Sequence, residues 1–96
     1  MDIYPSCVVK SMAGRDKGKY FVVMEQVDEN YVTICDGDLR PVERAKKKKR
    51  KHLKPMGKDI AHIKEKLDVK GKVSNREVRK DLKLALAEAG LIEEGI

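Results

Sequence analysis

The sequence predicts a small, mainly β protein in which a five-stranded β-barrel is followed by one or two C-terminal helices. Three observations lead to this fold class. Apolar residues alternate with a period of two through residues 6–42, and they change to helical spacing beyond Gly57. The chain has 96 residues, and a chain this short has enough apolar material for only one modest core. One barrel with a helical extension is therefore the largest architecture that we expect.

Four strands are expected in the N-terminal part of the chain, near residues 6–13, 19–28, 31–35 and 39–42. Their residues alternate with the period of half-buried strands, and Asp36-Gly37 is a strong hairpin signal before the fourth. Tight turns, few aromatic residues and no intervening helix favour a closed or nearly closed barrel over a helix-backed parallel sheet. A fifth strand is needed to close the barrel, and the best candidate is the short piece around His52-Leu53-Lys54.

A first helix is expected shortly after the barrel. Ile60, Ile63 and Leu67 lie at helical spacing and mark one amphipathic face of two to three turns. Residues 69–73, with Gly71 in the middle, are expected to connect this helix to the next one.

The last helix is the clearest element in the sequence. It begins at Ser74-Asn75-Arg76-Glu77, a capping box in which the Ser hydroxyl and the Glu carboxylate accept hydrogen bonds from each other's exposed backbone N–H groups. Gly90 supplies the end of the helix. The apolar stripe that follows the capping box consists of Val78, Leu82, Ala85, Leu86 and Ala89.

We assign residues 1–55 to the barrel, including a basic segment at 44–54, and residues 56–96 to a helical extension. No stretch approaches the roughly 18 apolar residues that a membrane span needs, and the first residues lack the order of a signal peptide. A cytoplasmic protein without a membrane span is therefore expected. Cys7 and Cys35 are far apart and have no His at ligand spacing, which predicts buried strand residues rather than a disulfide framework or a zinc site.

The net charge of +6 is concentrated in one segment. Residues 40–58 carry ten Lys or Arg against Glu43 alone, whereas residues 1–39 sum to −3 and residues 59–96 sum to zero. A local excess of this size attracts a polyanion, which could be RNA, DNA, an anionic membrane or an acidic protein. Charge alone does not choose between these partners.

A glycine-containing basic turn lies between the first two expected strands, in the segment Val8-Val9-Lys10-Ser11-Met12-Ala13-Gly14-Arg15-Asp16-Lys17-Gly18-Lys19-Tyr20-Phe21-Val22-Val23. Gly18 is expected to take a positive φ that a side chain resists, and Gly14 lets the chain leave the first strand sharply. The segment resembles the KOW motif, whose signature is a strand, a turn of the form Gly-x-x-x-Gly-Lys and a second apolar strand. The resemblance covers roughly residues 6–42, and one departure is Ser6, near where many KOW motifs begin with Gly.

This resemblance implies an SH3-like barrel that binds structured RNA, commonly ribosomal RNA, through the loop after the first strand and adjoining basic residues. In this sequence the loop is Arg15-Asp16-Lys17-Gly18-Lys19, and Asp16 is expected to brace the loop rather than touch a phosphate. The basic segment after the fourth expected strand is also similar to that of KOW proteins related to a large-subunit ribosomal protein of archaea and eukaryotes.

The strongest electrostatic feature is the run of basic residues at 44–52. Neutralising several phosphates with this run would release counterions and make binding steeply salt-dependent. Lysines give affinity and position, whereas base edges or RNA shape must give specificity. The alternative is a solvated, flexible loop that keeps the protein soluble, but beside a KOW motif we favour binding. The residues expected to bind RNA are Arg15, Lys17, Gly18, Lys19, Arg44, Lys46, Lys47, Lys48, Lys49, Arg50, Lys51 and His52.

Other residue types carry less functional signal. The aromatic residues could stack on bases, but a barrel this small needs most of them for packing. His52 and His62 have no acid, Cys or second His placed to support metal binding or general-base catalysis. The last helix carries cations opposite its apolar stripe, and a solvated face is favoured there over a second RNA contact. The residues concerned are Tyr4, Tyr20, Phe21 and Tyr31 among the aromatics, and Arg76, Arg79, Lys80 and Lys83 among the cations.

We therefore expect a non-enzymatic RNA-binding protein, monomeric when free and without a cofactor, in a ribosomal or ribosome-associated setting. No activated nucleophile, metal cluster or phosphate loop is evident in the sequence. DNA or an anionic membrane would also suit the lysine run, but the run is not part of an evident basic amphipathic helix and the KOW motif argues against both.

A rival interpretation is a protein-interaction module. SH3-like barrels of NusG-type transcription factors also use KOW motifs to touch polymerase or ribosomal proteins, and the C-terminal helix could dock in a partner's groove. Such a module would fail when Leu82 or Leu86 is made polar, whereas an RNA-binding protein would lose affinity when the lysines at 46–51 are neutralised.

Overall fold

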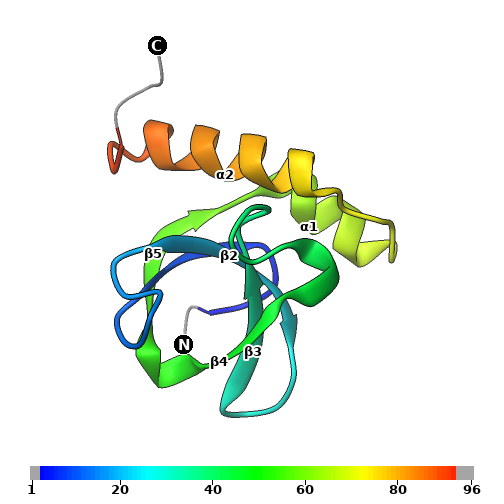
Figure 1. The fold of residues 1–96 in the computed structure, drawn as a ribbon. Helices are drawn as coiled ribbons and strands as arrows, with labels where there is room; N and C mark the ends of the chain where they lie inside the picture. Colours follow the sequence, from blue (N-terminus) through cyan, green and yellow to red (C-terminus); the bar gives the residue numbers. More distant parts are fainter. Residues whose placement is uncertain (1–2, 93–96) are drawn as a thin grey trace.

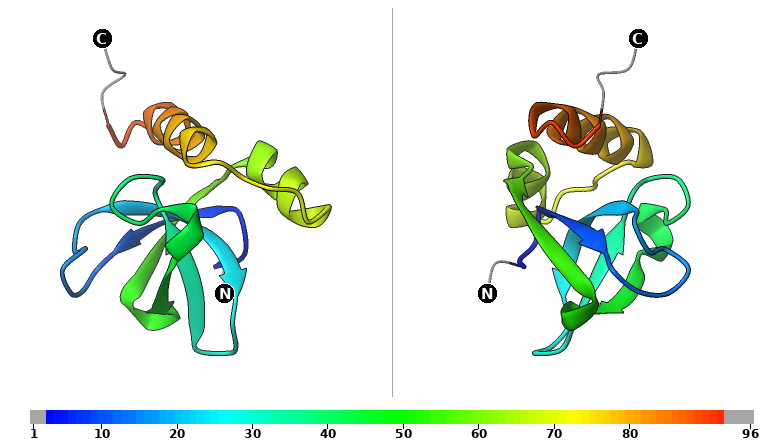
Figure 2. Two further views of the ribbon diagram at one scale, coloured as in Figure 1. Left: turned by 45° about the vertical axis from the view of Figure 1, so that its right-hand side comes forward. Right: turned by 90° about the vertical axis from the view of Figure 1, so that its left-hand side faces the viewer.

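A strongly curved antiparallel sheet is covered on one side by two helices in the computed structural model, which describes residues 3–92 (Figure 1). The strand order is β4-β3-β2-β1-β5, and Figure 2 shows the sheet curling around into a barrel. The turn η2 joins β4 to β5, and within the described residues no backbone pairing joins these two outer strands. The predicted fold class, a five-stranded β protein followed by helices, is confirmed. The elements are β1 Cys7–Ser11, β2 Tyr20–Gln26, β3 Tyr31–Cys35, η1 Val42–Arg44, β4 Lys46–Lys49, η2 Arg50–His52, β5 Leu53–Asp59, α1 Ala61–Asp68 and α2 Asn75–Glu88.

The fourth strand lies elsewhere than predicted, because residues 39–42 do not form a strand. The Asp36 carboxylate accepts hydrogen bonds from two backbone N–H groups that follow it, both at 2.9 Å, and thereby closes a compact turn. The Val42 N–H donates to the side chain of Asn75 at 2.7 Å rather than to a neighbouring strand. The strand is formed instead by the lysine run, Lys46–Lys49, whose identical residues show no alternation in the sequence.

The fifth strand is longer than the piece predicted at 52–54. β5 runs from Leu53 to Asp59 and therefore passes the predicted barrel boundary at residue 55. It is an outer strand that pairs with β1, where Ser11 lies opposite Leu53. Two residues after β5 the chain has already entered α1, so the sheet leads almost directly into the helices.

The chain enters β1 through a buried serine with left-handed backbone geometry. Ser6 has a φ of +84° and no exposed surface, in a region that glycine adopts far more readily than other residues. Its N–H donates to the Val23 carbonyl at 2.7 Å, and its carbonyl accepts from the Ile60 N–H at 3.0 Å. These two bonds hold Ser6 in the conformation that a glycine would favour, at the junction of β2, β1 and the start of α1.

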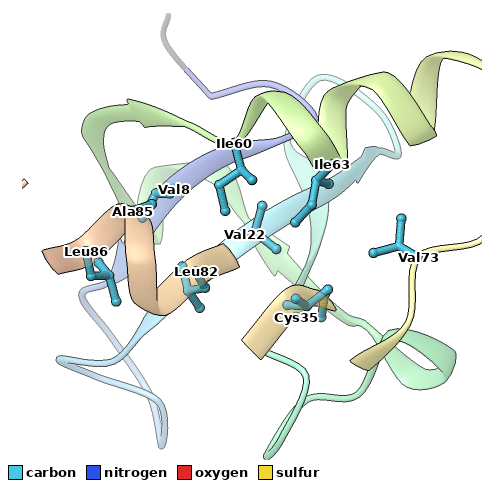
Figure 3. Packing of buried hydrophobic residues seen from close by; sticks show 10 residues of the cluster. Val8, Val22, Cys35, Ile60, Ile63, Val73, Leu82, Ala85 and Leu86 are labelled. Carbon is cyan, nitrogen blue, oxygen red and sulfur yellow. The ribbon is translucent and has the colours of Figure 1, made fainter. Parts of the chain in front are cut away.

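Two apolar clusters lie on opposite faces of the sheet. Consecutive residues of β1 illustrate the alternation, since Val8 belongs to the cluster beneath the helices and Val9 to the cluster inside the barrel. Most of the stripe predicted for the last helix packs against the sheet, with the exception of exposed Ala89 (Figure 3). The cluster inside the barrel contains Ile3, Cys7, Val9, Phe21, Val23, Val32, Ile34 and Leu53. The cluster beneath the helices contains Val8, Val22, Cys35, Ile60, Ile63, Val73, Val78, Leu82, Ala85 and Leu86.

Helix α2 is docked on the turn that follows β3. Gly37 in this turn has a φ of +79°, and a Cβ added there would lie 2.5 Å from the Asn75 carbonyl oxygen. The Arg79 guanidinium donates to the Gly37 carbonyl at 2.7 Å. The predicted capping box is confirmed, because the Ser74 hydroxyl accepts from the Glu77 N–H at 3.1 Å and the Glu77 carboxylate accepts from the Ser74 N–H at 2.8 Å.

Both cysteines are buried in strands, as predicted, and both are free thiols. Burial raises the pKa of the Cys35 thiol to about 12, and the neighbouring carboxylate of Asp36 acts in the same direction. A thiol held in this protonated form is a poor nucleophile and metal ligand. Among the described residues, no helix has the length and apolar character to span a bilayer.

Candidate RNA interface

The lysine run is an ordered edge strand of the sheet. β4 pairs antiparallel with β3, so that Tyr31 lies opposite Lys49 and Val32 opposite Lys48. Because side chains alternate across a strand, Lys47 and Lys49 share the outer face with Tyr31, whereas Lys48 shares the inner face with buried Val32. Four identical residues thus acquire different environments from the pairing register.

The ammonium group of Lys48 forms a hydrogen bond inside the protein. Its side chain is buried, with 8% of the residue exposed, and its Nζ donates to the Ala13 carbonyl at 2.9 Å. A Cβ added at Gly14 would lie only 3.2 Å from this Nζ, so the loop after β1 packs closely against the Lys48 ammonium group. This contact ties β4 to the KOW-like loop, and Lys48 is therefore left out of the residues that we propose for phosphate contact.

The loop after β1 is braced by a buried carboxylate. Asp16 is 3% exposed, and its Oδ2 lies 3.1 Å from the Arg40 guanidinium in an ion pair. The Gly18 N–H donates to the Ser11 carbonyl at 2.7 Å, and Gly18 has a φ of +88°. The bracing role expected for Asp16 and the positive φ expected for Gly18 are both confirmed. Arg15 on the same loop is exposed.

The 3-10 turn η2 holds the basic run against two other segments. The His52 carbonyl accepts from the Met12 N–H at 2.8 Å, which joins this turn to the start of the loop after β1. The Arg50 N–H donates to the Asn30 carbonyl at 2.8 Å, and its guanidinium donates to the Ile3 carbonyl at 2.9 Å. Loop, β4 and η2 therefore form one connected surface.

Six cations of this surface, all exposed except half-buried Lys46, form what we call the basic edge. Within residues 3–92, none of them forms an ion pair with a carboxylate. Lys47 instead lies over the ring of Tyr31, with its Nζ 4.6 Å from the ring centre. Unpaired cations held on an ordered strand and a braced loop can contact phosphates without first breaking internal ion pairs. The basic edge consists of Arg15, Lys17, Lys46, Lys47, Lys49 and Lys51.

The remaining predicted residues lie at the margins of this surface. Arg44 is exposed on η1, next to the turn that meets α2. Lys19, at the far end of the loop after β1, lines a shallow groove together with Arg79 and Lys83 of α2. The cations of α2 thus extend away from the basic edge along the helical side.

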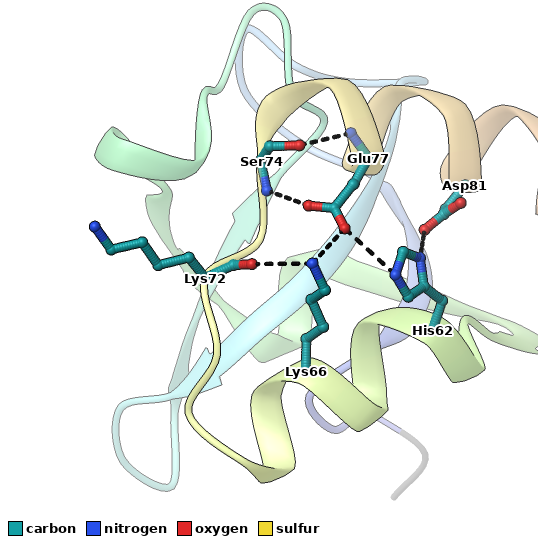
Figure 4. Close-up of polar contacts among 6 residues, drawn as sticks. All are labelled: His62, Lys66, Lys72, Ser74, Glu77 and Asp81. Carbon is teal, nitrogen blue, oxygen red and sulfur yellow. Dashed lines mark hydrogen bonds and ion pairs between the residues drawn. The ribbon is translucent and has the colours of Figure 1, made fainter.

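The premise that no acid is placed to support His62 is wrong, whereas the expectation that it is neither a metal ligand nor a general base stays a prediction. The sequence shows no acid at a supporting distance along the chain, yet His62 on α1 lies between two carboxylates of α2 (Figure 4). Its Nδ1 is 2.7 Å from Asp81 and its Nε2 is 3.3 Å from Glu77, which also binds Lys66 at 2.6 Å. The separation of these residues in the sequence conceals the contact. The contacts join α1 to α2, and no group of three metal-ligating side chains occurs among residues 3–92.

Comparison with known proteins identifies the family. The chain is 35% identical over 86 residues to "Large ribosomal subunit protein eL14" of Pyrobaculum islandicum, a match that covers 90% of this chain and 73% of that protein. The chain belongs to the eL14 family. The proteins of the same name from Pyrobaculum calidifontis and Pyrobaculum aerophilum are also 35% identical, over 86 and 88 residues. No family model matches the chain.

Membership of the eL14 family agrees with the resemblance to ribosomal proteins of the large subunit. It covers the barrel and the helices alike, because the match extends over nine-tenths of the chain. The rival interpretation required an apolar helix face that is free to dock. Leu82 and Leu86 are instead packed against the sheet, each less than one-tenth exposed, so that face of α2 is occupied by the protein's own barrel.

Proposed function

We propose that this protein is a ribosomal RNA-binding component of the large ribosomal subunit, and that the basic edge is its principal RNA contact. The observation that carries the proposal is the set of ordered and mostly exposed cations without carboxylate partners on β4, η2 and the loop after β1. Phosphate contacts from such a surface fix the position and orientation of the protein on a folded RNA. Membership of the eL14 family supports the same setting, a cytoplasmic ribonucleoprotein without a catalytic step.

The proposal predicts that the affinity for RNA falls steeply with salt concentration and that four lysines cause much of this dependence. Binding to a structured ribosomal RNA fragment is measured across a salt series for wild type and for a variant with Lys46, Lys47, Lys49 and Lys51 changed to Gln. Each lost phosphate contact should flatten the slope of log K against log salt concentration by roughly 0.7 to 0.9. Lys48 is kept because its ammonium group braces the loop.

A control variant removes the same charge from the helical side. Lys64, Lys72, Lys80 and Lys83 are all exposed, and changing them to Gln lowers the net charge by an equal amount. We expect this variant to keep nearly the wild-type slope of log K against log salt concentration. Wild type and this variant should both bind the ribosomal RNA more tightly than a DNA duplex of equal length. Equal slopes in the two variants would show that the basic edge is not the contact surface, and the absence of RNA binding would reject the function itself.

A further inference from the structure

A depression lies where the β2–β3 hairpin meets the end of β4. Its volume is about 440 Å³, within the range of roughly 300 to 1,000 Å³ that small-ligand sites occupy. The hairpin and the 3-10 turn form opposite walls, which are joined by the bond from the Arg50 N–H to the Asn30 carbonyl at 2.8 Å. The lining residues are Glu29, Asn30, Tyr31, Lys49, Arg50 and Lys51.

The aromatic residue of the depression is held in place. Tyr31 is half-buried on the outer face of β3, opposite Lys49, and Lys47 lies over its ring at 4.6 Å from the centre. The Asp28 carboxylate accepts the Tyr31 N–H at 2.9 Å, which fixes the backbone of the hairpin at this residue. A ring on a fixed backbone offers a stacking surface at little entropic cost, and stacking tolerates any base.

The polar lining is mixed in a way that suits a nucleotide better than a bare anion. Lys49 and Lys51 supply charge for a phosphate, but Glu29 lies in the same depression and would repel one. A carboxylate and an amide are instead suited to the edge of a base, because they accept and donate hydrogen bonds there. Within residues 3–92 the side chains of Glu29 and Asn30 take part in no hydrogen bond or ion pair, so both are available to a ligand.

We propose that this depression holds one unpaired nucleotide of the bound RNA, with its base against Tyr31, its base edge facing Glu29 and Asn30, and its phosphate beside Lys49 and Lys51. The inference rests on the proposed function and deepens it. The lysines of the basic edge carry no sequence information in themselves, whereas a pocket for one extruded base gives the protein a way to select a site on the RNA. The expectation that the aromatics serve packing remains correct for Phe21, which is fully buried.

The test compares two RNA hairpins that differ in one base. Both carry a single bulged nucleotide in the stem, which is guanosine in one RNA and an abasic ribose in the other, so the backbone distortion is the same. Guanine is chosen because its edge presents N–H donors to a carboxylate. Affinities are measured at one salt concentration for wild type, Tyr31→Phe and Tyr31→Leu, and thermal unfolding of each variant reports whether it is folded.

Wild type should bind the guanosine bulge about 10-fold more tightly than the abasic bulge, as expected for one stacked base. Tyr31→Phe should keep this preference and Tyr31→Leu should lose it, while the affinity for the abasic hairpin changes little. The double variant Glu29→Gln, Asn30→Ala leaves the ring in place and should lower the preference severalfold, which keeps the test valid if Tyr31→Leu unfolds.

The opposite results separate this inference from the function on which it rests. Equal binding of the two hairpins by wild type, with the salt dependence of RNA binding intact, would overturn the proposed nucleotide site. The RNA-binding function would still stand. A preference that survives both Tyr31→Leu and the double variant would also overturn it. Failure to bind either hairpin or ribosomal RNA would remove the function and the pocket together.

Discussion

Positive charge is arranged differently on the two sides of this protein. On the helical side, two lysines are joined to carboxylates: Lys66 Nζ lies 2.6 Å from Glu77 and Lys58 Nζ lies 3.3 Å from Glu88. At the basic edge, whose strand β4 lies on the far side of the barrel from α2 in Figure 1, the cations have no carboxylate partner among the described residues. The helical side therefore neutralises part of its positive charge within the fold, whereas the cations of the basic edge are all left for a ligand.

The difference teaches that the amount of charge does not by itself identify a binding surface. Residues 59–96 contain as many basic as acidic residues, and several of them form the joint between α1 and α2. Lys48 shows the same distinction within one strand, because it is bound to a carbonyl while its neighbours are exposed. Four substitutions examine this contrast, beginning with the one that should have the largest effect.

Replacing Gly37 by Ala tests how firmly the helical side is docked on the barrel. The new Cβ would meet the Asn75 carbonyl at 2.5 Å, and the backbone would have to keep a φ of +79°. Overpacking together with the left-handed conformation should lower the free energy of unfolding by about 3 kcal/mol. Denaturant unfolding monitored by circular dichroism measures this loss.

Gly18→Ala is the matched control for Gly37→Ala. Gly18 has a similar φ of +88°, but a Cβ there would meet no atom within 4 Å, so only the backbone term of about 1 kcal/mol remains. An equal loss in the two variants would mean that the turn does not press against α2. If the two sides are functionally separate, Gly37→Ala should still bind RNA with a wild-type salt slope at temperatures where it is folded.

Replacing Lys48 by Met tests whether one lysine of the run serves the fold. Met fills a similar volume, but it removes the hydrogen bond to the Ala13 carbonyl, and we expect a loss of about 2 kcal/mol in unfolding free energy. Lys49→Met, at an exposed position of the same strand, should change stability by less than about 0.5 kcal/mol. The salt slope of RNA binding should show the reverse order, so a larger slope change in Lys48→Met than in Lys49→Met would contradict the assignment.

These contrasts also show where sequence reasoning succeeds. The strands at 7–11, 20–26 and 31–35 and the capping box at Ser74 follow from local patterns, periodicity and capping chemistry, and each was expected near its observed place. The resemblance to the KOW motif led us to expect that Asp16 braces the loop, and Asp16 pairs with Arg40.

What the sequence did not indicate depends on contacts between distant residues. Lys46–Lys49 form a strand because β3 offers them a pairing edge, and a run of one residue type cannot reveal which member turns inward. The two carboxylates beside His62 come from α2, at sequence separations that no local pattern covers. Tyr31 was assigned to packing, and the depression that it lines exists only where the hairpin meets η2.

Replacing Ser6 by Gly should stabilise the junction between barrel and helices. Ser6 holds a φ of +84°, and its buried hydroxyl has no hydrogen-bond partner among the described residues. Relief of the left-handed conformation, offset in part by the greater freedom of Gly in the unfolded chain, should give a gain of about 1 kcal/mol. Ser6→Ala removes the hydroxyl and keeps the left-handed backbone. The free energy of unfolding should therefore be higher for Ser6→Gly than for Ser6→Ala. A loss of stability in the Gly variant would show that the backbone at Ser6 is not strained.

The pH dependence of stability should report the ion pairs of the helical side. The Lys66 ammonium, together with the Ser74 backbone N–H and hydroxyl, lowers the pKa of Glu77 from 4.5 to about 2 (Figure 4). The folded state therefore binds fewer protons than the unfolded state between these values, and the contribution of Glu77 is complete above pH 4.5 and is lost as the pH falls toward 2. The unfolding free energies of wild type and Glu77→Gln, measured from pH 7 to pH 2, should differ by a constant amount above pH 5 and converge below it.

Lys66→Met provides the control that assigns this effect to the joint between α1 and α2. Removing the ammonium takes away the largest cause of the lowered pKa, so the pH range of convergence should move upward toward 4.5. Parallel curves for wild type and Glu77→Gln down to pH 2 would mean that the ion pair contributes nothing to the fold. Lys66 would then be as free as the cations of the basic edge, and the absence of a carboxylate partner could no longer be used to locate the RNA contact.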